Sequence, residues 1–150
     1  MYRLVLLVAL TLLVPAFTAC TGSCSLDKLL KKDFAIEKVE PKYKDEGELT
    51  RIDFDMKIVG VETKKNGDNH DVDVTLIMTV AAPDGSDVPL PPDPNANLTL
   101  SSDSPIDFLT LKPFLQFPKS FPRGEYTVTF TATDNVANKK AEKKQIVTLE

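Results

Sequence analysis

The chain has 150 residues, a formal net charge of −4 and a pI near 5.1, with eleven prolines, two cysteines and one histidine. An acidic balance of this kind argues against a nucleic acid or an anionic lipid surface as the partner. Two cysteines and one distant histidine do not supply a structural zinc site, and we expect neither a metal nor another cofactor.

An apolar run opens the chain. Residues 4–14 read LVLLVALTLLV and follow a single positive charge at Arg3. A membrane-spanning helix needs roughly 20 apolar residues, and this run falls short of that length. A positive tip, a short apolar core and small residues at its end are typical of an export signal. We therefore expect a signal peptide over residues 1–19.

A cysteine stands where the apolar run stops. Residues 17–20 read FTAC, which resembles the lipobox of bacterial lipoproteins, with Phe17 where that family usually has Leu. In that family the cysteine thiol receives a diacylglycerol, and the signal peptide is cut before it. The resemblance implies lipidation of Cys20, a membrane partner and a place in the cell envelope, at the outer membrane facing the periplasm or at the cell surface.

Ordinary cleavage after Cys20 or Gly22 is the alternative, and it would release a secreted chain. Cys24 is an unpaired thiol or a second acylation site if Cys20 carries lipid. If Cys20 remains a thiol, a small Cys20–Cys24 ring becomes possible. Residues 20–33 are polar and are expected to form the lipidated N-terminus and a flexible tether.

The rest of the chain, residues 34–150, predicts strands. Residues 49–58, 71–80 and 124–134 alternate apolar and polar side chains, which is typical of half-buried strands. Weaker strand patterns cover residues 34–39, 97–100, 106–111 and 143–149. About seven strands predict an all-β domain, a single immunoglobulin-like antiparallel β-sandwich.

The Asn66-Gly67 pair is a strong hairpin signal, because a type I′ turn needs positive φ at both central residues. A turn centred there pairs Val59 with Val74, apolar with apolar. The alternation of apolar and polar residues shifts by one position between Ile58 and Val59. A β-bulge at that point would restore the pairing of apolar with apolar residues further along the strands. We therefore predict that residues 49–59 pair with residues 71–80 around a bulge.

No candidate catalytic group emerges from the polar residues. His70 lies among acids in a predicted turn, where capping of the turn is the simpler interpretation. Asp53 and Asp55 alternate with Arg51 and Lys57, which indicates a charge-balanced solvent face. A serine or cysteine nucleophile needs a histidine base, and the one histidine sits at a loop tip. We expect a protein that is not an enzyme.

Residues 122–140 resemble the penultimate strand and final hairpin of bacterial immunoglobulin-like and fibronectin-like domains. The shared features are the Gly124-x-Tyr126 start, the alternating strand, and the Asp134-Asn135 turn followed by Asn138. In that family the tyrosine hydroxyl bonds back to the upstream backbone as a structural corner. The resemblance implies this role for Tyr126.

An aromatic segment, PFLQFPKSFP, covers residues 113–122, and its prolines argue against a regular strand. An exposed apolar patch in this segment would mark a partner site, whereas the alternative is that the segment fills the core. The four residues concerned are Phe114, Leu115, Phe117 and Phe121.

Together these features predict a non-catalytic cell-envelope lipoprotein domain that binds an unknown envelope protein or glycan, or gives structural support. The alternatives are a secreted adhesion-type domain without lipid and an envelope hydrolase.

Overall fold

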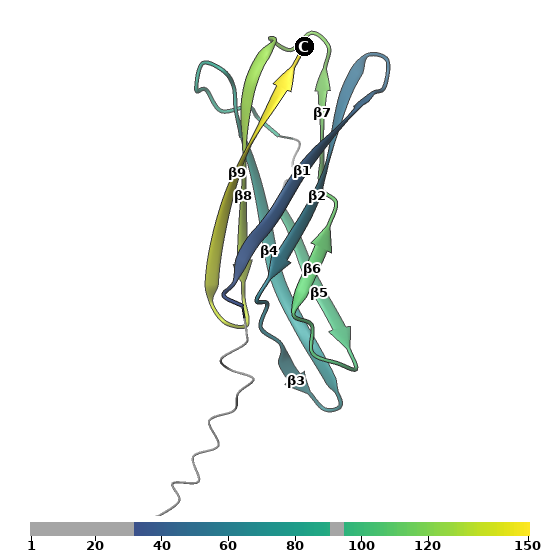
Figure 1. Ribbon diagram of the computed structural model, residues 1–150, viewed down its shortest axis with the longest axis vertical. Helices are drawn as coiled ribbons and strands as arrows, with labels where there is room; N and C mark the ends of the chain where they lie inside the picture. Colours follow the sequence, from purple (N-terminus) through teal and green to yellow (C-terminus); the bar gives the residue numbers. More distant parts are fainter. Residues whose placement is uncertain (1–31, 91–94) are drawn as a thin grey trace, which may run out of the picture.

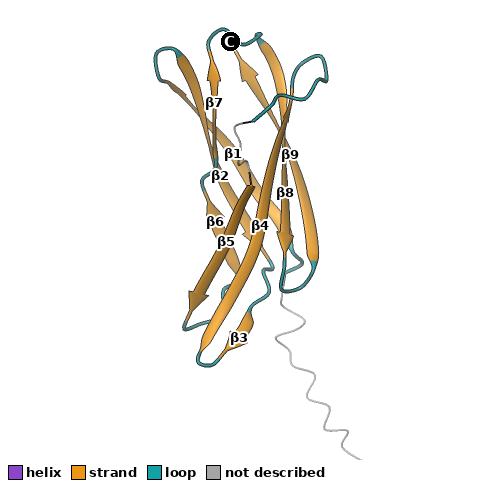
Figure 2. Cartoon of the chain, turned by 180° about the vertical axis from the view of Figure 1, so that it is seen from behind, coloured by secondary structure: helices purple, strands orange, loops and turns teal. Residues whose placement is uncertain are grey.

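The computed structural model describes residues 32–90 and 95–150, so the predicted signal peptide and Cys20 lie outside the described residues. The described part contains strands and no helix, and its strands form two antiparallel sheets that face each other (Figures 1 and 2). The predicted all-β sandwich is confirmed. The described residues contain no helix that could cross a membrane.

Four strands form one sheet, here called the β2 sheet: β1 (Ala35–Asp45), β2 (Leu49–Val59), β6 (Phe108–Leu111) and β7 (Phe114–Pro118). The other, the β4 sheet, contains β3 (Lys64–Asn66), β4 (Asn69–Ala81), β5 (Asn95–Ser102), β8 (Gly124–Asp134) and β9 (Lys139–Leu149). In the β2 sheet, β2 is central, with β1 on one side and β6 and β7 in succession on the other. In the β4 sheet the order is β5-β4-β8-β9, and β3 pairs with the first residues of β4.

The core lies between the sheets and consists of the apolar residues that the alternating patterns place inward. Along β2, β4 and β8 every second side chain is buried, as the sequence predicts. Phe54 from β2 meets Phe130 from β8 edge to face, with ring centroids 5.0 Å apart. Such a geometry adds to the free energy gained from removing both rings from water.

The predicted pairing of residues 49–59 with residues 71–80 is wrong, because β2 and β4 belong to opposite sheets. Gly60 has a positive φ of 68°, and from there the chain crosses to the other sheet. The phase slip at Ile58 and Val59 therefore marks the end of a strand rather than a bulge. The irregular register lies instead in β1, between Ile36 and Lys38.

The hairpin near Asn66 exists, but it is short and shifted by one residue. Asn66 pairs with Asn69, so Gly67 and Asp68 form the two-residue turn. Gly67 has a positive φ of 63° and Asp68 does not, which is the pattern of a type II′ turn rather than type I′.

Residues 114–118 form a strand, contrary to the expectation that prolines would prevent one. Pro113 and Pro118 stand before and at the end of β7, so neither removes a donor from its middle. Pro113 still accepts a hydrogen bond from the Phe54 N–H, at 2.9 Å. Because both β6 and β7 pair with β2, they act as one edge strand with a break.

The described chain begins and ends at opposite ends of the sandwich (Figure 1). Ala35 pairs with Val59 at one end, and β9 runs to the other end, where Leu149 pairs with Gly124. Anything attached before residue 32 therefore joins the sandwich far from its C-terminal end.

Candidate binding groove

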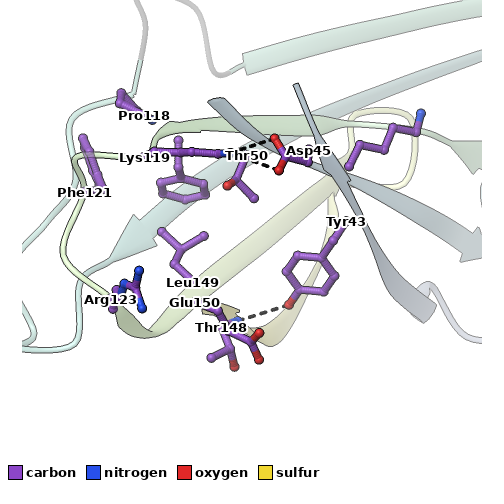
Figure 3. Close-up of a pocket in the computed structure, with 12 residues that line it drawn as sticks. Tyr43, Asp45, Thr50, Pro118, Lys119, Phe121, Arg123, Thr148, Leu149 and Glu150 are labelled. Atoms are coloured by element: carbon purple, nitrogen blue, oxygen red, sulfur yellow. Dashed lines mark hydrogen bonds and ion pairs between the residues drawn. The ribbon is translucent and has the colours of Figure 1, made fainter. Parts of the chain in front are cut away.

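An open groove of about 690 Å³ lies at the C-terminal end of the sandwich, where β1, β7 and β9 finish (Figure 3). Its floor is apolar and is formed by Phe117, Phe121 and Leu149. Its rim is polar and carries charges of both signs, among them Asp45, Lys119 and Arg123.

The floor follows from the alternation in β7 and from the turn after it. Phe117 points inward and is 3% exposed, and its ring centroid lies 5.7 Å from that of Phe121 and 5.3 Å from that of Tyr126. The Tyr126 hydroxyl donates to the Pro122 carbonyl at 2.7 Å, which is the bond that the resemblance implied. This bond ties the turn to the start of β8 and holds Phe121 against the end of the core.

One side of the rim is held by an ion pair. The Lys119 ammonium lies 2.9 Å from an Asp45 carboxylate oxygen, and the same carboxylate accepts the Gly47 N–H at 2.9 Å. These contacts, that of Lys119 above all, lower the pKa of the Asp45 carboxyl below its ordinary value. Asp45 and Lys119 therefore neutralise each other beside the apolar floor.

The rest of the rim includes Tyr43, on the same strand as Asp45, and Arg123 (Figure 3). The Tyr43 ring is half exposed, and its hydroxyl accepts the Thr148 N–H at 3.1 Å. Arg123 is exposed, and no carboxylate among residues 32–90 and 95–150 pairs with it. Its guanidinium keeps all its donors available to a bound molecule.

The four aromatic-segment residues singled out in the sequence do not form one exposed patch. Strand alternation places Leu115 and Phe117 in the core, at 5% and 3% exposure, and turns Phe114 outward at 47%. Phe114 lies under the Arg51 guanidinium, 4.0 Å from its ring centroid, on the outer face of the β2 sheet. Only Phe117 and Phe121 come together at the groove.

Asp53 and Asp55 lie on the outer face of the β2 sheet, among cations. Asp53 pairs with Lys44 and Arg51, and these contacts lower the pKa of its carboxyl. Asp55 pairs with Lys42, with the same effect on its pKa. The face is a ladder of alternating charges, and both acids are held in the ionised form.

The acids near His70 are engaged by neighbouring polar groups. Asp71 accepts hydrogen bonds from Asn66 and from Ser101, and both lower the pKa of its carboxyl. Asp73 accepts a bond from the Asn135 side chain at 2.8 Å. Within the part of the chain that the structure describes, no group of three or more histidines, cysteines or acids could hold a metal ion.

Tyr43, Lys119 and Arg123 were missed in the sequence because segments far apart along the chain must meet to form the groove. The groove combines an apolar floor, a neutralised ion pair and an available guanidinium. No family model matches the chain, and no curated protein matches its sequence.

Proposed function

We propose that this chain is a non-catalytic cell-envelope domain, anchored by lipid on Cys20, whose groove binds a protein or glycan partner or links it to a larger assembly. The observation that supports the proposal is the position of the groove. It lies where β1, β7 and β9 finish, at the end of the sandwich opposite to the start of β1, which follows the predicted tether (Figure 1). A chain held at its N-terminus would present the groove away from the membrane.

The chemistry of the groove suits a partner with an apolar group next to an acidic or hydroxyl-rich one. Phe121 is partly exposed and offers an apolar surface from which water can be displaced, and the buried Phe117 and Leu149 lie beside it in the groove. Arg123 beside that floor offers donors to a carboxylate or to sugar hydroxyls. Aromatic residues and arginine are the side chains that most often dominate binding energy at protein interfaces.

The tether would keep the domain near its membrane, with the groove at the far end of the sandwich. Residues 21–33 span at most about 45 Å when fully extended. Two or three acyl chains anchor a protein stably, whereas one chain of myristoyl length binds only reversibly.

Lipidation is tested by the intact mass of the mature chain and by Cys20→Ser. We expect a wild-type chain that begins at Cys20 with added acyl mass and sediments with membranes. The Cys20→Ser chain should leave the membrane fraction and keep its thermal stability. A mature chain that begins at Thr21 or Ser23 without lipid would contradict the anchor and favour the secreted alternative.

The groove is tested by cross-linking in the native envelope, followed by identification of the captured partner. Arg123→Glu should abolish capture, because it reverses the available charge at the rim. Lys112→Glu is the matched control, since Lys112 is exposed outside the groove and undergoes the same change of charge. Equal capture by both variants would show that the groove is not the binding site.

A further inference from the structure

Strand β5 is an open edge of the β4 sheet. It pairs with β4 along one side only, and no other described strand pairs with its second side (Figure 2). Asn97, Thr99, Leu100 and Ser101 are all exposed. A row of backbone N–H and C=O groups is therefore available to another extended strand.

The composition of β5 differs from that of the other edges. Its sequence, NANLTLSS, contains no charged residue and no proline. Strand β1 contains Pro41 and three lysines, and β9 contains four lysines, with the Tyr43 hydroxyl capping its Thr148 N–H. The edge formed by β6 and β7 is interrupted at Lys112 and Pro113. Lysine and proline are residues that protect edges from pairing. Strand β5 has neither along its eight residues, whereas β6, which also has neither, is only four residues long and is followed at once by Lys112 and Pro113.

We propose that β5 pairs antiparallel with β5 of a second copy of this chain, about a two-fold axis near Thr99. Leu98 and Leu100 pair with Val74 and Val72 of β4 and so point to the core side of their sheet. With Thr99 opposite its own copy, each Leu98 stands opposite Leu100 of the second copy. Asn97 and Ser101 meet on the outer side. The strand is thus self-complementary on both faces, as a two-fold contact requires.

Charge favours a second copy over an unrelated charged strand. Pairing of two β5 strands places no charged side chain opposite another, because β5 contains no charged residue. Asp103 directly follows β5 and in this register would stand opposite position 95 of the second copy, which is an asparagine. Asp71 and Asp73 lie on the neighbouring strand β4 and already accept hydrogen bonds from polar side chains. Two β4 strands separated by two β5 strands would lie about 14 Å apart, beyond the Debye length of about 8 Å at physiological ionic strength. At that separation the acids of the two β4 strands are largely screened from each other.

Pairing would also bury Leu100, which is 43% exposed in the single chain. The groove stays open, because β1, β7 and β9 form it at another part of the sandwich. The inference is therefore independent of the proposed function, and either can fail without the other.

Sedimentation of the mature chain over a wide range of concentrations tests the pairing, in detergent if the chain carries lipid. We expect a reversible monomer–dimer equilibrium, with amide exchange in residues 97–102 slowing as the dimer forms. Thr99→Lys and Thr99→Glu should each raise the dimer dissociation constant by about tenfold or more, since like charges then face each other across the axis. A mixture of the two variants should restore the dimer.

Thr110→Lys is the matched control, because Thr110 is an exposed threonine on edge strand β6 of the other sheet. It should leave the dissociation constant unchanged. Leu100→Lys is a second β5 variant with the same expected effect as Thr99→Lys, and circular dichroism checks that each variant is folded. A chain that stays monomeric at every concentration would overturn the proposal, and so would a dimer that folded Thr99 and Leu100 variants leave intact.

Discussion

Asp134 at the end of β8 is a fully buried acid, with 0% of its surface exposed. One carboxylate oxygen accepts the Glu62 N–H at 2.7 Å, and the other accepts the N–H groups of Val136 and Ala137 at 2.9 and 3.0 Å. Glu62 lies in the crossover between the sheets, whereas the other two donors lie in the β8–β9 turn. One side chain therefore joins two segments that are 72 positions apart.

Replacing Asp134 with Ala removes the acceptor of all three backbone donors. A donor left without a partner costs about 1–3 kcal/mol. The three donor residues, Glu62, Val136 and Ala137, are only partly buried, so we expect a total loss of about 3–5 kcal/mol. Asp134→Asn keeps one acceptor oxygen for the turn and points an amide N–H₂ group at Glu62. It should cost about 1–3 kcal/mol, because only the crossover donor loses its partner.

Urea unfolding followed by far-ultraviolet circular dichroism measures both losses. Asp84→Ala is the control, because Asp84 makes the same kind of local bond to Ser86 but is exposed. It should change the free energy of unfolding by less than about 1 kcal/mol, since water replaces the lost acceptor. Equal losses for Asp134→Ala and Asp134→Asn would refute the reasoning, because the number of unpaired donors would then not decide the cost.

Three further outcomes are expected. Phe117→Ala should lower the free energy of unfolding by about 3–5 kcal/mol, whereas Phe114→Ala should cost less than about 1 kcal/mol, since it removes only an exposed cation–π contact. Gly60→Ala should destabilise more than Gly67→Ala in thermal unfolding; both have positive φ, but a Cβ at residue 60 would overlap a backbone oxygen of Lys32, whereas a Cβ at residue 67 would meet open space. The ion-paired acids of the β2 sheet have lowered pKa values, so their contribution to stability is complete above the unfolded pKa near 4 and is lost as the pH falls through the folded pKa. Urea midpoints measured from pH 7 to pH 2 should therefore fall at the acid end, and less so in Asp53→Asn; a slope unchanged by that variant would contradict this account.

Alternation predicts the faces of the long strands because a half-buried strand admits one arrangement of its apolar residues. Alternation does not identify which strands pair with each other, and the pairing predicted from it is wrong here. A hairpin joining residues 49–59 to residues 71–80 satisfied the local pattern, yet Gly60 turns the chain to the opposite sheet. Facing strands in a sandwich carry the same alternation as paired strands, so the pattern cannot separate the two cases.

The groove shows a second limit of structure prediction from this sequence. Tyr126 was identifiable through the family resemblance, whose motif is local, and its hydroxyl bonds to Pro122, four residues back. The inward positions of Leu115 and Phe117 were not predicted, because the neighbouring prolines argued against a regular strand in this segment. The pair of Asp45 with Lys119 joins the ends of two strands separated by 74 positions, and only the finished sandwich brings them together.

Pairing through β5 would turn the second copy end over end, because an antiparallel two-fold contact reverses the long axis of the sandwich. The two N-terminal ends would then point in opposite directions. Strand β4, with 13 residues, is about 44 Å long, nearly the full reach of the tether at about 45 Å. Two copies anchored in one membrane would need one tether stretched along the whole sandwich, whereas copies on facing membranes would not.

Vesicles that carry the lipid-anchored chain should therefore cluster, as measured by light scattering, and Thr99→Lys should prevent clustering while Thr110→Lys does not. Dimers that form in solution without any clustering of vesicles would show that the tether, not the strand pairing, has been misjudged.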